Sequence, residues 1–76
     1  MSNFVGFDKF QIRELEKGVE KGIDVTVYAK PEFSTERMWC IRNLMERGKD
    51  FSEFLDPNVL DEDALLKRYK EIKAHN

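Results

Sequence analysis

Apolar residues recur at helical spacing in three separate stretches of the chain. Spacings of three or four residues place side chains on one face of an α-helix, and charged residues fill most of the intervening positions. The pattern therefore predicts an all-α fold with three main helices, at about 8–21, 34–47 and 61–74. The three stripes are Ile12, Leu15 and Val19, then Met38, Ile41 and Met45, then Leu65, Tyr69 and Ile72.

Each predicted helix follows a residue that can cap its N-terminus. Asp8 and Gln11 fit a capping box, in which the carboxylate accepts from the backbone and the amide reaches back. Ser34 and Asp61 hold the corresponding places before the second and third helices. These residues predict where the helices begin.

Glycines mark the ends of the first two helices. Gly22 and Gly48 stand where a left-handed terminating residue is favoured, so both are predicted to end a helix. Gly18 lies inside the first helix at a cost of up to ~1 kcal/mol relative to alanine. We therefore expect another helix to approach closely at Gly18.

One segment of the chain occurs twice. Residues 22–33 return in degenerate form as 48–59, with glycine, aspartate, a hydroxyl, an aromatic and a proline in the same order and at the same spacing. Such an internal repeat predicts units that stack on one another to bury their apolar faces. The expected organisation is one domain, 1–76, made of repeats at 7–32 and 33–59 and a divergent capping helix at 60–76, with 1–6 flexible.

The linkers between the helices could be mistaken for strands. Residues 24–28 alternate and are rich in β-branched side chains, which by itself indicates a strand. Their counterpart at 50–55 fits a capping box followed by apolar residues at i, i+3 and i+4, which indicates a helical turn. We therefore expect one-turn helices at about 25–29 and 51–55, capped by Asp24 and Asp50 and followed by Pro31 and Pro57.

The stripes and linkers together predict the core. Its expected members are Ile12, Leu15, Val19, Val25, Tyr28, Phe33, Met38, Ile41, Leu44, Met45, Phe51, Phe54, Leu65, Tyr69 and Ile72.

Composition narrows the class of protein. The 76 residues are 41% hydrophobic and 37% charged, with a net charge of −2, which is typical of a globular domain and gives no overall field for a polyanion. The single cysteine cannot form an internal disulfide, and no apolar run is long enough to cross a membrane. The sequence therefore predicts a soluble cytosolic protein without a membrane segment.

Candidate chemistry is sparse. His75 is the penultimate residue, and Cys40 lacks an obvious activating base. The acidic run 61–63 fits the start of a helix, and no glycine-rich phosphate loop with a Walker lysine is present. The interpretation is a protein without catalytic, cofactor or metal residues, hence not an enzyme.

Trp39 is the residue that the helical stripe does not explain. With Met38 at 0° on a helical wheel, Ile41 and Met45 fall at about 300° and 340°, whereas Trp39 falls near 100°. In one account Trp39 covers the third helix together with Leu66, which falls near 100° on its own helix. In the other, Trp39 is an exposed anchor flanked by Arg37 and Arg42, residue types common in interface hot spots. The second account predicts an interaction surface at these three residues.

The linker and second helix resemble a known pattern. The run 22–33, followed by Met38, Ile41 and Arg42 in a Met-x-x-Ile-Arg helix, resembles a tandem helical repeat of uncharacterised bacterial proteins, often associated with mobile elements of Gram-positive bacteria. The resemblance implies a helical fold and leaves the function open.

Two functions follow as hypotheses. The first is a small non-enzymatic module, monomeric or weakly oligomeric, that binds another protein. The alternative is an accessory nucleic-acid binder that uses the basic residues of the second and third helices. Those basic residues are Arg37, Arg42, Arg47, Lys49, Lys67, Arg68, Lys70 and Lys73.

Overall fold

The computed structural model describes residues 5–75, and within that range the chain contains helices and no strand. Its three α-helices are α1 (Lys9–Glu20), α2 (Thr35–Glu46) and α3 (Leu65–Ala74). Two short 3₁₀ helices, η1 (Val25–Val27) and η2 (Ser52–Leu55), lie between them. The predicted all-α fold with three main helices is confirmed.

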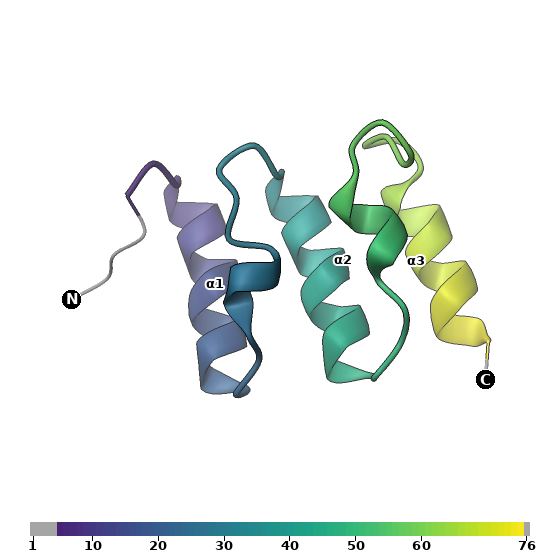
Figure 1. The fold of residues 1–76 in the computed structure, drawn as a ribbon, viewed down its shortest axis with the longest axis horizontal. Helices are drawn as coiled ribbons and strands as arrows, with labels where there is room; N and C mark the ends of the chain where they lie inside the picture. Colours follow the sequence, from purple (N-terminus) through teal and green to yellow (C-terminus); the bar gives the residue numbers. More distant parts are fainter. Residues whose placement is uncertain (1–4, 76) are drawn as a thin grey trace.

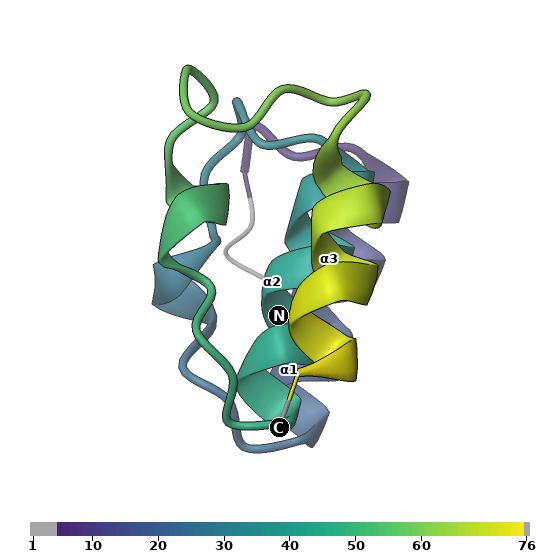
Figure 2. The same ribbon diagram turned by 90° about the vertical axis from the view of Figure 1, so that its right-hand side faces the viewer.

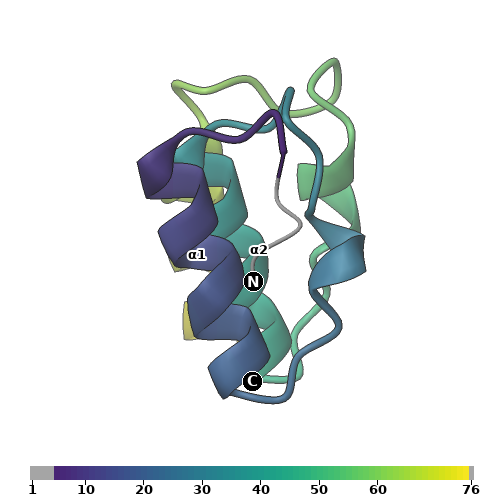
Figure 3. The same cartoon turned by 90° about the vertical axis from the view of Figure 1, so that its left-hand side faces the viewer.

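The helices form two layers. Figure 1 shows α1, α2 and α3 side by side, each beginning at the upper end, with the chain returning upward through η1 and then η2. Seen along the row, the α-helices occupy one layer and the 3₁₀ helices the other (Figures 2 and 3). Because α2 lies between α1 and α3 and contacts both, it forms the middle of the row. One side of the helical layer is covered by the returning chain, and the other is open.

The predicted capping residues hold the starts of α1 and α2. Asp8 Oδ1 accepts from the backbone N–H of Gln11 at 2.8 Å, and Gln11 Oε1 accepts from the backbone N–H of Asp8 at 2.9 Å. This capping box is the one predicted. Ser34 Oγ accepts from the backbone N–H of Arg37 at 3.1 Å and caps α2.

Gly22 and Gly48 end α1 and α2 in the same way. Their φ angles are 73° and 67°, the left-handed region that glycine adopts without strain. The N–H of Ile23 donates to the carbonyl of Gly18, and the N–H of Lys49 donates to that of Leu44, both at 2.9 Å. These bonds satisfy carbonyls left open at the helix ends.

The linkers are helical, as the repeat indicated. Asp24 Oδ1 accepts from the N–H of Thr26 at 3.1 Å, and Asp50 Oδ1 accepts from the N–H of Ser52 at 3.0 Å. The capping box expected at residues 50–53 is wrong, because the carboxylate of Glu53 binds Arg68 on α3 instead. Turns that include Pro31 and Pro57 follow the two 3₁₀ helices.

The third helix begins later than predicted. Asp61 does accept from the backbone N–H of Ala64 at 3.0 Å, but it caps a turn at 62–64, and α3 starts at Leu65. The carboxylate of Glu62 turns toward α2, where it accepts from Ser34 and Arg37. These contacts between distant segments compete with the regular helix that the local sequence favours.

The core lies between the two layers and along the helix contacts. Nine of the predicted core residues are buried: Leu15, Tyr28, Phe33, Met38, Ile41, Leu44, Phe54, Leu65 and Tyr69. Four others are partly buried against them: Val25, Met45, Phe51 and Ile72. Cys40 and Leu60 are also buried, although they are not in the predicted set of core residues.

Val19 and Ile12 were predicted wrongly as core residues. Val19 is 58% exposed, and Ile12, although partly buried, is not among the side chains that pack against the buried cluster. In α2 the corresponding residues of the repeat are Met45 and Met38, whose side of the helix also carries Arg42 and faces α1. That side of α1 has no helix beside it in the described chain, because α1 is at the end of the row (Figure 1).

Gly18 makes room for the linker rather than for another helix. An ideal Cβ at Gly18 would overlap the hydroxyl of Tyr28 and would lie 2.5 Å from Cγ1 of Val25. Any side chain at this position would therefore collide with η1 and the residue after it. The expected close approach is found, and the approaching element is the 3₁₀ helix η1 with Tyr28 after it, not one of the other α-helices.

The prediction of a flexible start concerns residues 1–6. Residues 1–4 lie outside the described range. Val5 and Gly6 form a turn before α1, and Gly6 has a φ angle of 92°.

Candidate interaction surface

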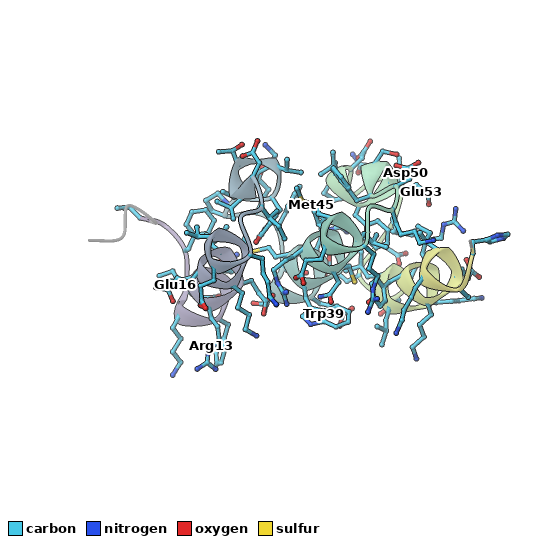
Figure 4. All side chains as sticks on the ribbon, turned by 90° about the horizontal axis from the view of Figure 1, so that it is seen from below. Arg13, Glu16, Trp39, Met45, Asp50 and Glu53 are labelled. Carbon is cyan, nitrogen blue, oxygen red and sulfur yellow. The ribbon has the colours of Figure 1, made fainter. Side chains whose placement is uncertain are left out.

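The open face is the side of α1, α2 and α3 that points away from η1 and η2. Figure 4 shows Arg13 and Trp39 on this face, opposite the side that carries Asp50 and Glu53. Arg13 and Trp39 hold the same place along α1 and α2, each one turn into its helix. Leu66 of α3 lines the same hollow as Trp39. An aromatic and an aliphatic side chain from neighbouring helices are thereby brought together.

Trp39 is partly buried on α2. Its ring meets Tyr69 of α3 edge-on, with centroids 4.9 Å apart and planes inclined by 64°. Such a T-shaped arrangement is a favoured one for aromatic pairs. The hydroxyl of Tyr69 accepts from Nε of Arg47 at 3.3 Å, which fixes the far side of the pair. Trp39 thus contacts α3, as one of the two accounts expected, and still reaches the surface.

An open hollow of about 460 Å³ lies beside the indole. We call it the Trp39 hollow, and it is lined by Glu14, Thr35, Glu36, Trp39 and Leu66. Leu66 is 41% exposed, so an aliphatic side chain at the wall is accessible to a partner. All three α-helices contribute to the lining.

Arg42 does not flank Trp39 at the surface. It is buried, its Nε donates to Glu14 Oε1 at 3.0 Å, and its Nη1 donates to Glu46. Burial alone would lower the pKa of Arg42, but the bonds and charges of Glu14 and Glu46 outweigh it and raise that pKa above its ordinary value. Arg42 therefore joins α2 to α1 and is unavailable to a partner.

Arg37 is also inside the molecule, with 1% of its surface exposed. Its Nη1 donates to the carbonyl of Phe54 at 2.9 Å, and its Nη2 donates to the carbonyl of Leu60 at 2.5 Å. Nη2 also binds Glu62 at 2.9 Å. The expectation that Arg37 and Arg42 form a surface with Trp39 is wrong, because both guanidinium groups complete buried hydrogen-bond networks.

Three of the other six basic residues of the alternative hypothesis are also engaged. Arg68 binds Glu53 at 2.7 Å and Glu71 at 3.2 Å. Lys49 donates to the carbonyl of His75, and Arg47 binds Tyr69. Three exposed lysines of α3 remain: Lys67, Lys70 and Lys73. The burial of Arg37 and Arg42 therefore removes two members of the basic set from the surface, and three more are paired within the molecule.

Two weakly acidic groups are buried. Burial raises the pKa of the Cys40 thiol to about 12, so it is protonated at neutral pH. Burial likewise raises the pKa of Tyr28 to about 12, and the Tyr28 hydroxyl donates to the carbonyl of Glu14 at 2.8 Å. Among residues 5–75, each buried side-chain nitrogen or oxygen has a hydrogen-bond partner, and no three His, Cys, Asp or Glu side chains are arranged to hold a metal ion.

The Trp39 hollow could be anticipated only in part from the sequence. Trp39 was singled out by its angle on the helical wheel, and Leu66 by falling at a similar angle on its own helix. Thr35 and Glu36 carried no signal of their own. Glu14 looked like one more charged residue of an amphipathic helix, whereas it is buried against Arg42.

Comparisons with known proteins add no relative. No protein-family model, curated protein or solved structure matches this chain. The resemblance to a tandem helical-repeat family and the division into repeats therefore stay predictions. None of the helices between residues 5 and 75 has the length and apolar character needed to cross a bilayer.

Proposed function

We propose that this protein is a small, non-enzymatic, cytosolic module that binds another protein through the Trp39 hollow. The observation that carries the proposal is the exposure of Leu66 beside a partly buried indole on the open face. Tryptophan is enriched at the centres of interfaces, where a large ring is desolvated within a ring of weaker contacts. An apolar patch with polar edges is typical of such sites.

The hollow is held in place by its neighbours, which favours binding. Trp39 rests against Tyr69, and Glu14 is fixed by Arg42 at 3.0 Å and by Lys17 at 3.5 Å. A preorganised surface loses less conformational entropy when a partner docks.

Nucleic-acid binding has weaker support. Arg37 and Arg42 are buried, so only part of the basic set that this function needs is at the surface. Retardation of duplex DNA that weakens steeply with salt would favour it over protein binding.

The test uses two exposed apolar residues in different places. Leu66→Glu puts a charge in the hollow, whereas Val59→Glu makes the same change on a side chain that is 62% exposed in the turn before α3. We expect the wild type and the Val59→Glu variant to capture the same partner from a lysate, and the Leu66→Glu variant to lose it. The purified partner should then change the fluorescence of Trp39, the only tryptophan.

The opposite pattern would refute the proposal. If Leu66→Glu keeps every partner that the wild type binds, or if the purified partner leaves Trp39 fluorescence unchanged, the hollow is not the binding site. Circular dichroism of the two variants checks that both are folded.

A further inference from the structure

A second apolar group lies on α1, near the Trp39 hollow. Phe10 is 58% exposed, and Nζ of Lys9 lies 5.3 Å from the centre of its ring. We call Lys9, Phe10 and Arg13 the basic aromatic edge. With Glu16 they line a hollow of about 350 Å³ beside α1. An exposed phenylalanine with two cations beside it contributes little to the core and is suited to docking.

The basic aromatic edge and the Trp39 hollow lie on the same face. Phe10 is one helical turn before Glu14, which lines the Trp39 hollow. Arg13 and Trp39 also point in a common direction in Figure 4. A single partner surface could therefore meet both features at once.

The two features carry opposite charge. The ionisable residues that line the Trp39 hollow are the carboxylates Glu14 and Glu36. Glu14 is already neutralised by Arg42 and Lys17, which leaves Glu36, an exposed residue, to attract a cation. The hollow beside α1 has two cations, Lys9 and Arg13, and one carboxylate, Glu16.

We propose that the occupant of the Trp39 hollow is a second copy of this chain, which inserts Phe10 against Trp39 and Leu66 and sets Lys9 and Arg13 near Glu36. A two-fold axis in the plane of the open face brings each edge onto the other copy's hollow, so the contact is made twice and the assembly closes as a dimer. The net charge of −2 opposes this association only weakly. The inference rests on the proposed function, because it names a partner for the same hollow.

The experiment reverses the charge of each half of the contact. Sedimentation equilibrium of the full chain, from about 10 μM to about 1 mM at low salt, measures the association constant. Glu36→Lys, and separately the pair Lys9→Glu with Arg13→Glu, should each weaken association at least about tenfold through like-charge contacts. Glu20→Lys makes the same charge change as Glu36→Lys at the far end of α1, and should leave the association constant within about twofold.

Mixing the two altered proteins provides the decisive measurement. In the mixed dimer each contact again joins a cation and a carboxylate, so an equimolar mixture should form a heterodimer although each protein alone associates at least about tenfold more weakly than the wild type. Phe10→Ser should abolish the wild-type dimer and, when added to both altered proteins, the heterodimer. A variant that fails to fold would be recognised by its circular dichroism, and the association constant of the wild type tests the inference without any substitution.

Several results would overturn the inference: a wild type that stays monomeric at about 1 mM, a Glu36→Lys protein that associates as tightly as the wild type, or a mixture that fails to form the heterodimer. These results are separable from failure of the proposed function. A monomeric wild type whose captured partner is lost in Leu66→Glu would refute the dimer alone, leaving a different protein as the occupant.

Discussion

The first half of the molecule, α1 with η1, is tied together by an amide, whereas the second half, α2 with η2, is tied by a guanidinium ion. Gln11 donates from Nε2 to the carbonyls of Pro31 at 3.0 Å and Phe33 at 2.6 Å. Arg37, the corresponding residue of the second half, donates to the carbonyls of Phe54 and Leu60. Both residues connect the first turn of a helix to the chain that returns alongside it.

The difference lies in how far each side chain reaches. The amide of Gln11 supplies two donor hydrogens, and both of its bonds to the returning chain go to backbone carbonyls. The guanidinium of Arg37 supplies five, so it also binds Glu62 and draws the segment before α3 toward α2. We call these two side chains the clamps of their halves. The Gln11 clamp holds α1 to its own linker, whereas the Arg37 clamp holds α2 to its linker and also positions the segment before α3.

The halves also differ in how the helix receives the linker. Gly18 leaves space for Tyr28, whose hydroxyl reaches the carbonyl of Glu14. At the corresponding positions the second half has Leu44 and Phe54, both fully buried. The first half therefore pairs a glycine with a tyrosine whose hydroxyl needs a hydrogen bond. The second half pairs a leucine with a phenylalanine, which needs none.

The strongest break in the comparison should come from the two clamps. Arg37→Met leaves the carbonyls of Phe54 and Leu60 unpaired and should lower the free energy of unfolding by about 3–4 kcal/mol, since each unpaired buried carbonyl costs about 1–3 kcal/mol. Gln11→Met removes neutral bonds and should cost about 1–2 kcal/mol. Urea denaturation of both variants measures the difference, and equal losses would show that the charge on Arg37 adds nothing.

An intermediate effect is expected at Gly18. Gly18→Ala places a methyl group against Tyr28 and Val25 and should cost about 2 kcal/mol through overpacking. Adding Tyr28→Phe removes the closest atom, so the double variant should be more stable than the sum of the two single changes implies. Thermal unfolding of the wild type, both single variants and the double variant tests this; strict additivity would contradict the contact.

The smallest effect at neutral pH concerns the two buried acids, Tyr28 in the first half and Cys40 in the second. Burial raises the pKa of Cys40 from 9.0 to about 12. Between these values the unfolded thiol has lost its proton and the folded thiol has kept it, so the folded state binds more protons. This contribution is fully present below about pH 9 and falls by roughly 1.4 kcal/mol per pH unit as the pH rises toward 12.

The two acids can be separated by substitution. Tyr28 contributes over a narrower range, since burial raises its pKa from 10.0 to about 12. Cys40→Ala should therefore flatten the decline of stability that begins near pH 9, whereas Tyr28→Phe should flatten only the part above about pH 10. Urea denaturation at stepped pH measures both slopes, and an unchanged slope in Cys40→Ala would contradict the burial of the thiol.

Local features of the fold were predictable from the residues. The stripes located three helices, Asp8 and Ser34 located the starts of two, and Gly22 and Gly48 located their ends. The recurrence of the linker segment at residues 48–59 indicated that residues 24–28 form a helical turn. Helical periodicity, capping and left-handed glycine each depend on residues only a few positions apart, so the sequence alone is enough to predict these local features.

The candidate surface was predictable only at Trp39. Arg37 and Arg42 looked like exposed companions of the indole, but each is buried with partners that lie far along the chain, such as Glu14 and Leu60. Whether an arginine faces solvent or binds a carbonyl far along the chain depends on which segments pack beside it. Helical periodicity contains no information about those long-range neighbours.

The sequence by itself determined the three helices, the caps of α1 and α2 and the helical linkers, because those depend on hydrogen bonds and torsion angles between nearby residues. Only the tertiary structure decided that Arg37 and Arg42 are internal, that Val19 is exposed at the end of the row and that α3 begins at Leu65. Each of these depends on the order in which the helices pack and on the two layers that they form. The Trp39 hollow is a product of the same packing, since all three α-helices must lie side by side before its walls exist.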